Sequence, residues 1–141
     1  MKKTIEDFVR ESNTIERIHR DPTKEEIEEL RRFMDLPRIT IDELLTFVSV
    51  YQPNAKLRDQ YNMDVRVGRY VPPFGGPEIP VQLKVLLDSD RDAYDLHIAY
   101  EKLHPFTDCN GRTGRALWAH RMEDISLGFL HRFYYQVLER N

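Results

Sequence analysis

Apolar residues recur along this chain at the three- and four-residue spacing of one helix face, and the period returns in several short stretches. In the first stretch, residues 4–19, the apolar face consists of Ile5, Phe8, Val9 and Ile15. Two further stretches begin at threonine–glutamate pairs typical of a helix start, Thr23 with Glu26 and Thr40 with Glu43. The pattern predicts short amphipathic helices joined by tight breaks.

The same spacing resumes after residue 80 and predicts the rest of a helical bundle. It resumes with Val81, Val85 and Leu86 as one apolar face and runs to Leu103, and a proline two residues later prevents the helix from continuing. Another helix is predicted to begin near Arg112, and a last one to cover residues 126–139. Residues 64–71 alternate in polarity before a pair of prolines, which is typical of a short hairpin or flap. We therefore predict an all-α fold of six to seven helices with one small β-hairpin flap.

The composition fits one globular domain. A chain of 141 residues can bury one sizeable core, and its 40% hydrophobic and 32% charged residues exclude the disordered and membrane-spanning classes. Its net charge of -3, with both signs interspersed, gives no reason to expect nucleic acid as a partner. The single cysteine excludes an internal disulfide, and the first residues lack the apolar run of a signal peptide. We expect a cytoplasmic protein with no membrane partner.

The most unusual stretch is residues 104–115, which read His-Pro-Phe-Thr-Asp-Cys-Asn-Gly-Arg-Thr-Gly-Arg. It places a titratable base, a carboxylate, a glycine and two arginines between two predicted helices. Unpaired backbone N–H groups and the positive end of the helix dipole meet where the second helix begins, and they attract anions. Two arginines there oppose the dipole at a cost of ~0.3–1 kcal/mol each, which makes sense where a polyanion binds. The stretch predicts a site for phosphate chemistry.

Taken alone, each of these side chains also has a simpler explanation. His104, with an intrinsic pKa near ~6.5, can accept a proton at neutral pH, but a histidine at a helix end is often only a cap. Asp108 suits Mg²⁺, but an aspartate in a loop is often a turn former. Arg112 and Arg115 share one helix face and could pair with surface acids instead. The combination, rather than any single residue, favours catalysis.

The stretch resembles the Fic-domain motif H-x-F-x-[D/E]-G-N-G-R-x-x-R. Seven of its eight fixed positions match, namely His104, Phe106, Asp108, Asn110, Gly111, Arg112 and Arg115. The resemblance extends from about residue 40 onward, through the predicted flap to the closing helix at 129–138. So many matches in one window are not expected by chance.

The resemblance implies transfer of AMP from ATP to a serine, threonine or tyrosine hydroxyl of a target protein. His104 would be the general base, and Asp108 would hold Mg²⁺ between the α- and β-phosphates. Asn110 and Gly111 would line the anion pocket, and the two arginines would clamp the distal phosphates. The phenylalanine would anchor the loop in the core. An extended target segment would dock along the flap at 64–71 by adding a strand, unless the flap only covers the pocket.

One motif position differs, because Cys109 stands where the family has glycine. If that position needs a positive φ, a residue with a side chain costs on the order of 1 kcal/mol. The thiol could be passive or a nucleophile. The resemblance assigns the base to His104 and favours a passive cysteine.

A second segment, residues 12–17 with the sequence Ser-Asn-Thr-Ile-Glu-Arg, resembles the inhibitory motif [S/T]-x-x-x-E-[G/N] that some Fic proteins carry on an N-terminal helix. The resemblance implies that Glu16 pairs with Arg115 and prevents productive placement of the γ-phosphate. Ser12 and Glu16 lie four residues apart and share one helix face. The simpler alternative is that Glu16 is one of many surface glutamates. Arg17 stands where the motif has glycine or asparagine.

Residues 1–141 are therefore expected to form a single Fic domain, with residues 1–20 as an inhibitory helix and residues 21–141 as the catalytic core. Two other functions stay open. One is a catalytically silent module that senses nucleotide and binds proteins, which the departures at Cys109 and Arg17 leave open. The other is a Fic protein that transfers a different phosphate-containing group or removes AMP. The identity of the target protein, the preferred nucleotide and self-association into a homo-oligomer also stay open.

Overall fold

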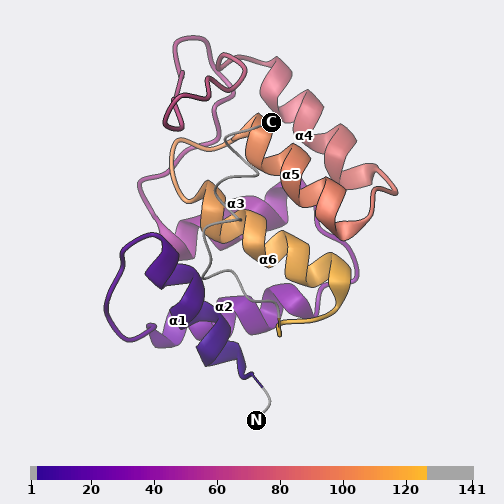
Figure 1. Cartoon of the computed structure of the whole chain (residues 1–141). Helices are drawn as coiled ribbons and strands as arrows, with labels where there is room; N and C mark the ends of the chain where they lie inside the picture. Colours follow the sequence, from indigo (N-terminus) through magenta and orange to yellow (C-terminus); the bar gives the residue numbers. More distant parts are fainter. Residues whose placement is uncertain (1–2, 127–141) are drawn as a thin grey trace.

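The structure is a computed structural model that describes residues 3–126, and within that range it contains six helices (Figure 1). They are α1 (Ile5–Ile15), α2 (Lys24–Met34), α3 (Ile41–Tyr51), α4 (Glu78–Asp88), α5 (Ala93–Leu103) and α6 (Asn110–Met122). The predicted all-α fold is confirmed. The last predicted helix, residues 126–139, falls almost entirely outside the described residues. No helix in the described part of the chain is long and apolar enough to cross a membrane.

Helix α6 lies at the centre of the bundle, where it packs against α1, α2, α3 and α5 (Figure 1). Its buried residues lie on all sides and include small ones, such as Gly114, Ala116 and Ala119. A helix that is covered on every side needs small residues where its neighbours approach closely. A Cβ at Gly114, for example, would collide with the carboxylate of Glu101 on α5. The central position of α6 fixes its amino end, where the candidate site begins.

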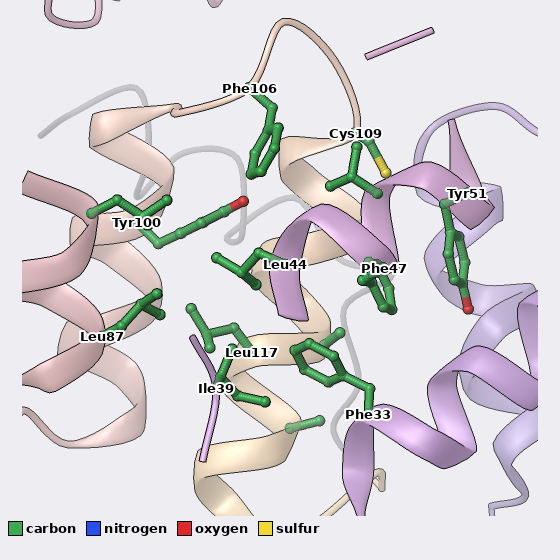
Figure 2. Packing of buried hydrophobic residues seen from close by; sticks show 14 of the residues in the cluster. Phe33, Ile39, Leu44, Phe47, Tyr51, Leu87, Tyr100, Phe106, Cys109 and Leu117 are labelled. Atoms are coloured by element: carbon green, nitrogen blue, oxygen red, sulfur yellow. The ribbon is translucent and has the colours of Figure 1, made fainter. Parts of the chain in front are cut away.

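The hydrophobic core reaches from the inner faces of the helices up to the motif loop, residues 104–109 between α5 and α6. Figure 2 shows Phe106, from the loop between α5 and α6, in the same cluster as core residues of α3 and α6. Phe106 is fully buried. On α3, the rings of Phe47 and Tyr51 stack with centroids 4.3 Å apart, and Phe33 of α2 packs against Phe47 at 5.1 Å. The loop is therefore anchored in the same core that holds the helices together.

The two predicted helix starts are both present, but only one is a complete capping box. Thr23 accepts a bond from the backbone N–H of Glu26, whose side chain accepts one from the N–H of Thr23 in return. Thr40 accepts from the N–H of Glu43, but the Glu43 carboxylate binds Arg32 at 2.6 Å instead of turning back. Tertiary pairing has replaced the local bond there.

The prediction of one helical stretch from Val81 to Leu103 was wrong in two respects. The chain breaks after Asp88 and restarts at α5, where the Asp92 side chain accepts from the N–H of Asp95 at 2.8 Å. The buried face of α4 also differs from the predicted one: it consists of Ile79, Leu83 and Leu87, whereas Val81 and Val85 are exposed. The helix predicted over 4–19 is shorter than expected and ends at Ile15.

The predicted hairpin flap at 64–71 is not confirmed. Within it the structure has a single antiparallel bridge, in which Val67 and Tyr70 exchange backbone hydrogen bonds of 2.9 and 2.8 Å across a tight turn. The segment closes at its base, where the carboxylate of Asp64 accepts from the N–H of Gly75 at 2.9 Å. The flap segment is therefore a folded loop rather than a two-stranded ladder.

The observed orientation of α4 predicts different effects for two neighbouring substitutions. Leu83→Ala removes a fully buried side chain, so we expect the free energy of unfolding to fall by about 2–5 kcal/mol. Val85→Ala, at a position that is 63% exposed, should change it by less than about 0.5 kcal/mol. Urea denaturation of both variants measures the difference. Equal losses would contradict the orientation of α4 described above.

Candidate active site

The motif residues occupy the end of α5, a short loop and the first turn of α6. His104 is the C-cap of α5, and its backbone has a left-handed conformation with φ 50° and ψ 60°. Its N–H donates to the carbonyl of Tyr100 at 2.9 Å, and Pro105 then prevents a further helical turn. Helix α6 begins at Asn110. The catalytic candidate and the start of the next helix therefore lie at the two ends of one short loop.

The side chain of Asn110 determines the shape of this loop. Its Oδ1 accepts from the N–H of Phe106 at 2.9 Å, and its Nδ2 donates to the carbonyl of the same residue at 2.7 Å. Asn110 is also almost completely buried. What this position offers at the amino end of α6 is therefore the backbone, because the amide side chain is already engaged.

The other side of the loop pairs with residues 56–58. Leu57 and Phe106 form an antiparallel bridge, the N–H of Thr107 donates to the carbonyl of Lys56 at 2.8 Å, and the N–H of Arg58 donates to the carbonyl of Pro105 at 2.9 Å. A loop held by hydrogen bonds along both edges presents its side chains in a fixed arrangement.

The half-buried imidazole of His104 is neutral near pH 7. Its burial and, second, the charge of Arg58 lower the pKa of His104 to about 4. Its Nδ1 atom is buried and has no hydrogen-bond partner within the described residues. A neutral imidazole retains a lone pair, so His104 can accept a proton at physiological pH.

Asp108 presents an exposed carboxylate on the same loop. Its Oδ1 accepts from the N–H of Cys109 at 2.7 Å, and its Oδ2 accepts from Nε2 of Gln52 at 3.2 Å. Within residues 3–126, no three metal-binding side chains cluster into a complete protein cage. Mg²⁺ commonly binds through one carboxylate together with substrate phosphates and water. Asp108 therefore fits a magnesium ion that arrives with a nucleotide.

The first two turns of α6 contain two buried arginines, Arg112 and Arg115, and its first turn has no acidic residue. Arg115, which is fully buried, donates from Nε to Oγ of Ser12 at 2.8 Å and from Nη2 to the carbonyl of Ser12 at 3.0 Å. The same Nη2 forms an ion pair with the carboxylate of Glu16. The structure thus brings Arg115 together with two residues that lie about a hundred positions earlier in the sequence.

The Glu16 carboxylate lies directly at the amino end of α6. A Cβ at Gly111 would collide with it, so the glycine leaves the space that the carboxylate occupies. Backbone N–H groups and the positive end of the helix dipole attract an anion at this position. Glu16 therefore supplies the negative charge that the first turn of α6 lacks.

Arg112 is bound more loosely than Arg115. Its guanidinium lies 3.4 Å from Oδ1 of Asn13, 3.5 Å from the carbonyl of Tyr51 and 4.0 Å from the carboxylate of Glu26. Its Nε is buried without a hydrogen-bond partner among the described residues. These long contacts leave Arg112 able to engage an added anion. Asn13, which the motifs do not single out, lies on α1, so this helix contacts Arg112 as well as Arg115.

The two departures from the family patterns both fall at left-handed backbone positions. Cys109 has φ 68°, and Arg17 has φ 62°. Arg17 follows α1 in a Schellman ending, in which the N–H of Ile18 reaches the carbonyl of Asn13 and that of Arg17 reaches Thr14. Glycine, or often asparagine, is favoured at such positions, and side chains there cost roughly 1–2 kcal/mol.

The thiol of Cys109 is suited to packing rather than to chemistry. It is buried, its Sγ lies 3.7 Å from Oγ1 of Thr113, and burial raises the pKa of Cys109 above its ordinary value. A protonated, buried thiol is a poor nucleophile.

Comparison with known proteins places this site in a family. A model of the Fic/DOC family matches residues 11–120, which form most of the chain. The match contains the whole motif loop and also the segment with Ser12 and Glu16, so it reaches further toward the amino terminus than the resemblance from about residue 40. No curated protein matches the chain. Fic proteins commonly transfer nucleotide or phosphate groups. The chain belongs to the Fic/DOC family.

Proposed function

We propose that this protein is an adenylyltransferase that transfers AMP from Mg²⁺-ATP to a serine, threonine or tyrosine hydroxyl of a target protein, and that α1 restrains it. One observation carries the proposal. A single rigid loop combines a neutral imidazole, an exposed carboxylate and a helix start that attracts anions. These are the parts that phosphate transfer requires, because catalysis of this reaction depends mainly on positioning and charge neutralisation.

In the proposed reaction His104 takes the proton from the target hydroxyl. The hydroxyl oxygen then forms a bond to the α-phosphorus of ATP, the bond from that phosphorus to the oxygen bridging to the β-phosphate breaks, and pyrophosphate leaves. A magnesium ion held by Asp108 would neutralise part of the phosphate charge. The backbone at Gly111, together with Arg112 and Arg115, would hold the distal phosphates at the start of α6.

The proposed restraint comes from competition for one anion site. The Glu16 carboxylate lies against Gly111 and pairs with Arg115, so a γ-phosphate placed there would meet a like charge. Ser12 accepts from the same arginine, and Asn13 reaches Arg112. Helix α1 thus contacts both arginines that the nucleotide would need. The target segment is proposed to dock along the flap segment, residues 64–71, beside this loop.

A catalytically silent nucleotide sensor is the second candidate. The observation in its favour is the left-handed conformation of Cys109, at the position where the family motif has glycine. The two candidates differ in one measurable property, which is transfer that depends on His104.

Removal of the Glu16 charge should release the enzyme. We expect Glu16→Gln and Glu16→Gly to increase AMP incorporation by about tenfold or more, since one charge-assisted pair is worth roughly 1.5–3 kcal/mol. Intact-mass analysis of the protein after incubation with Mg²⁺-ATP, alone and with candidate targets, measures the adduct. Glu11→Gln, on the same helix but paired with Lys3, is the matched control and should leave incorporation unchanged.

The same assay separates the two candidate functions. His104→Ala in the Glu16→Gly protein should abolish the adduct while nucleotide still binds. Binding without any adduct that depends on His104 would favour the silent sensor, and equal incorporation in wild type and Glu16→Gln would refute restraint by Glu16.

A glycine at position 17 should strengthen the restraint. Arg17→Gly removes the side chain from a residue whose backbone is left-handed. We therefore expect the free energy of unfolding to rise by about 0.5–1 kcal/mol. Because the Schellman ending holds Glu16 in place, basal AMP incorporation should fall. Arg10→Gly, inside α1, is the control and should lower the free energy of unfolding by about 1 kcal/mol. A less stable Arg17→Gly protein would contradict this explanation.

A further inference from the structure

Arg58 is a fully buried arginine that lies next to the site and that no motif singles out. Its guanidinium donates four hydrogen bonds, all to backbone carbonyls. Nε binds His104 at 2.7 Å, Nη2 binds Leu103 at 2.9 Å, and Nη1 binds Met63 at 3.0 Å and Pro73 at 2.9 Å. Four of the five N–H groups of an arginine are thus used in one place.

The environment of Arg58 explains how its charge is tolerated. Within the described residues it forms no ion pair, and burial lowers the pKa of Arg58. The carbonyls of Leu103 and His104 are the last ones of α5, where the helix dipole concentrates negative potential. The guanidinium therefore caps the carboxyl end of α5 from outside the helix.

The same side chain connects two parts of the site that are far apart in sequence. Met63 lies just before the flap segment and Pro73 just after it, so Arg58 binds both of its ends. On the other side it binds the backbone of His104, whose left-handed conformation needs support from its surroundings. A second link joins the flap segment to α5, because the hydroxyl of Tyr70 donates to the carbonyl of Lys102 at 2.7 Å.

We propose that Arg58 is a positioning residue, which holds the backbone of His104 and both ends of the flap segment as one rigid unit. This inference rests on the proposed transfer function: a hydroxyl docked on the flap segment meets the imidazole only if the two keep a fixed separation. The hydrogen bonds of Arg58 go to the end of α5 and to the two ends of the flap segment, so we expect it to act on the target and the base rather than on the nucleotide.

The charge of Arg58 has a separate consequence for His104. It contributes, after burial, to the lowered pKa of the imidazole, whereas Glu16, Asp108 and a backbone hydrogen bond at Glu101 act in the opposite direction. Loss of the charge should therefore raise the pKa of His104. Loss of the planar guanidinium geometry alone, with the positive charge retained, should leave the pKa of His104 nearly unchanged.

Kinetics of Arg58→Lys and Arg58→Gln in the Glu16→Gly protein test the proposal. Lysine keeps the charge but cannot form the planar fork, so we expect kcat for transfer to fall about 100-fold, as for a small displacement of a catalytic group. The Kd for ATP should stay within about threefold. Arg38→Lys, at an exposed arginine near Asp88, is the control and should change neither. A kcat retained within about twofold, or a matching loss of ATP affinity, would overturn the proposal.

Two further measurements keep the outcome clear. NMR titration of the His104 ring needs no activity: its midpoint should rise in Arg58→Gln but not in Arg58→Lys, and equal midpoints in all three proteins would overturn the role of Arg58.

If the Arg58 variants do not fold, Tyr70→Phe removes the second link with little loss of packing. It should lower kcat several-fold at unchanged ATP affinity, and an unchanged kcat would refute the rigid unit. A Glu16→Gly parent that forms no adduct would refute the proposed function instead.

Discussion

The burial of two arginines in the first two turns of α6 is the constraint on which the rest of the site depends. Cations at a helix start oppose the dipole, and a buried guanidinium without a counter-charge is costly. Helix α1 resolves this in the isolated chain, because Glu16 and Ser12 bind Arg115 and Asn13 approaches Arg112. A nucleotide would have to replace that counter-charge. The same electrostatic requirement therefore explains the attachment of α1 to the bundle and the proposed restraint on activity.

The opposite end of the loop is governed by a different buried arginine. Arg58 binds the last carbonyls of α5 and the two ends of the flap segment, and Asn110 holds the loop backbone between them. On the nucleotide side of the site, the counter-charge of the two arginines could thus be exchanged for phosphate. On the side with His104, the backbone is held in place by hydrogen bonds. The proposed transfer reaction needs this division, because a polyanion would have to bind and leave while the proposed base stays in place.

The sequence predicted the elements of the fold better than their faces and links. Helical spacing and the Thr23–Glu26 pair located most of the helical segments, since these signals are local, but the spacing merged α4 and α5 into one stretch. The apolar face predicted from Val81 and Val85 is exposed, because either face of α4 has apolar residues and only the neighbouring helices decide which face is buried. The two motifs single out His104 and Glu16 as candidates, but nothing in either pattern singles out Arg58 or Asn13. Their partners are distant in sequence, and a lone arginine next to an aspartate resembles any surface cation.

Calorimetry with ATP and AMP is the most direct measurement of whether Glu16 occupies the anion site of α6. Glu16→Gln should tighten the binding of Mg²⁺-ATP by about tenfold, which corresponds to the loss of one competing charge-assisted hydrogen bond. The binding of AMP, which has no distal phosphates, should remain within about twofold. If the substitution changes the two affinities equally, or changes neither, the carboxylate does not compete with the phosphates, and the central claim is wrong.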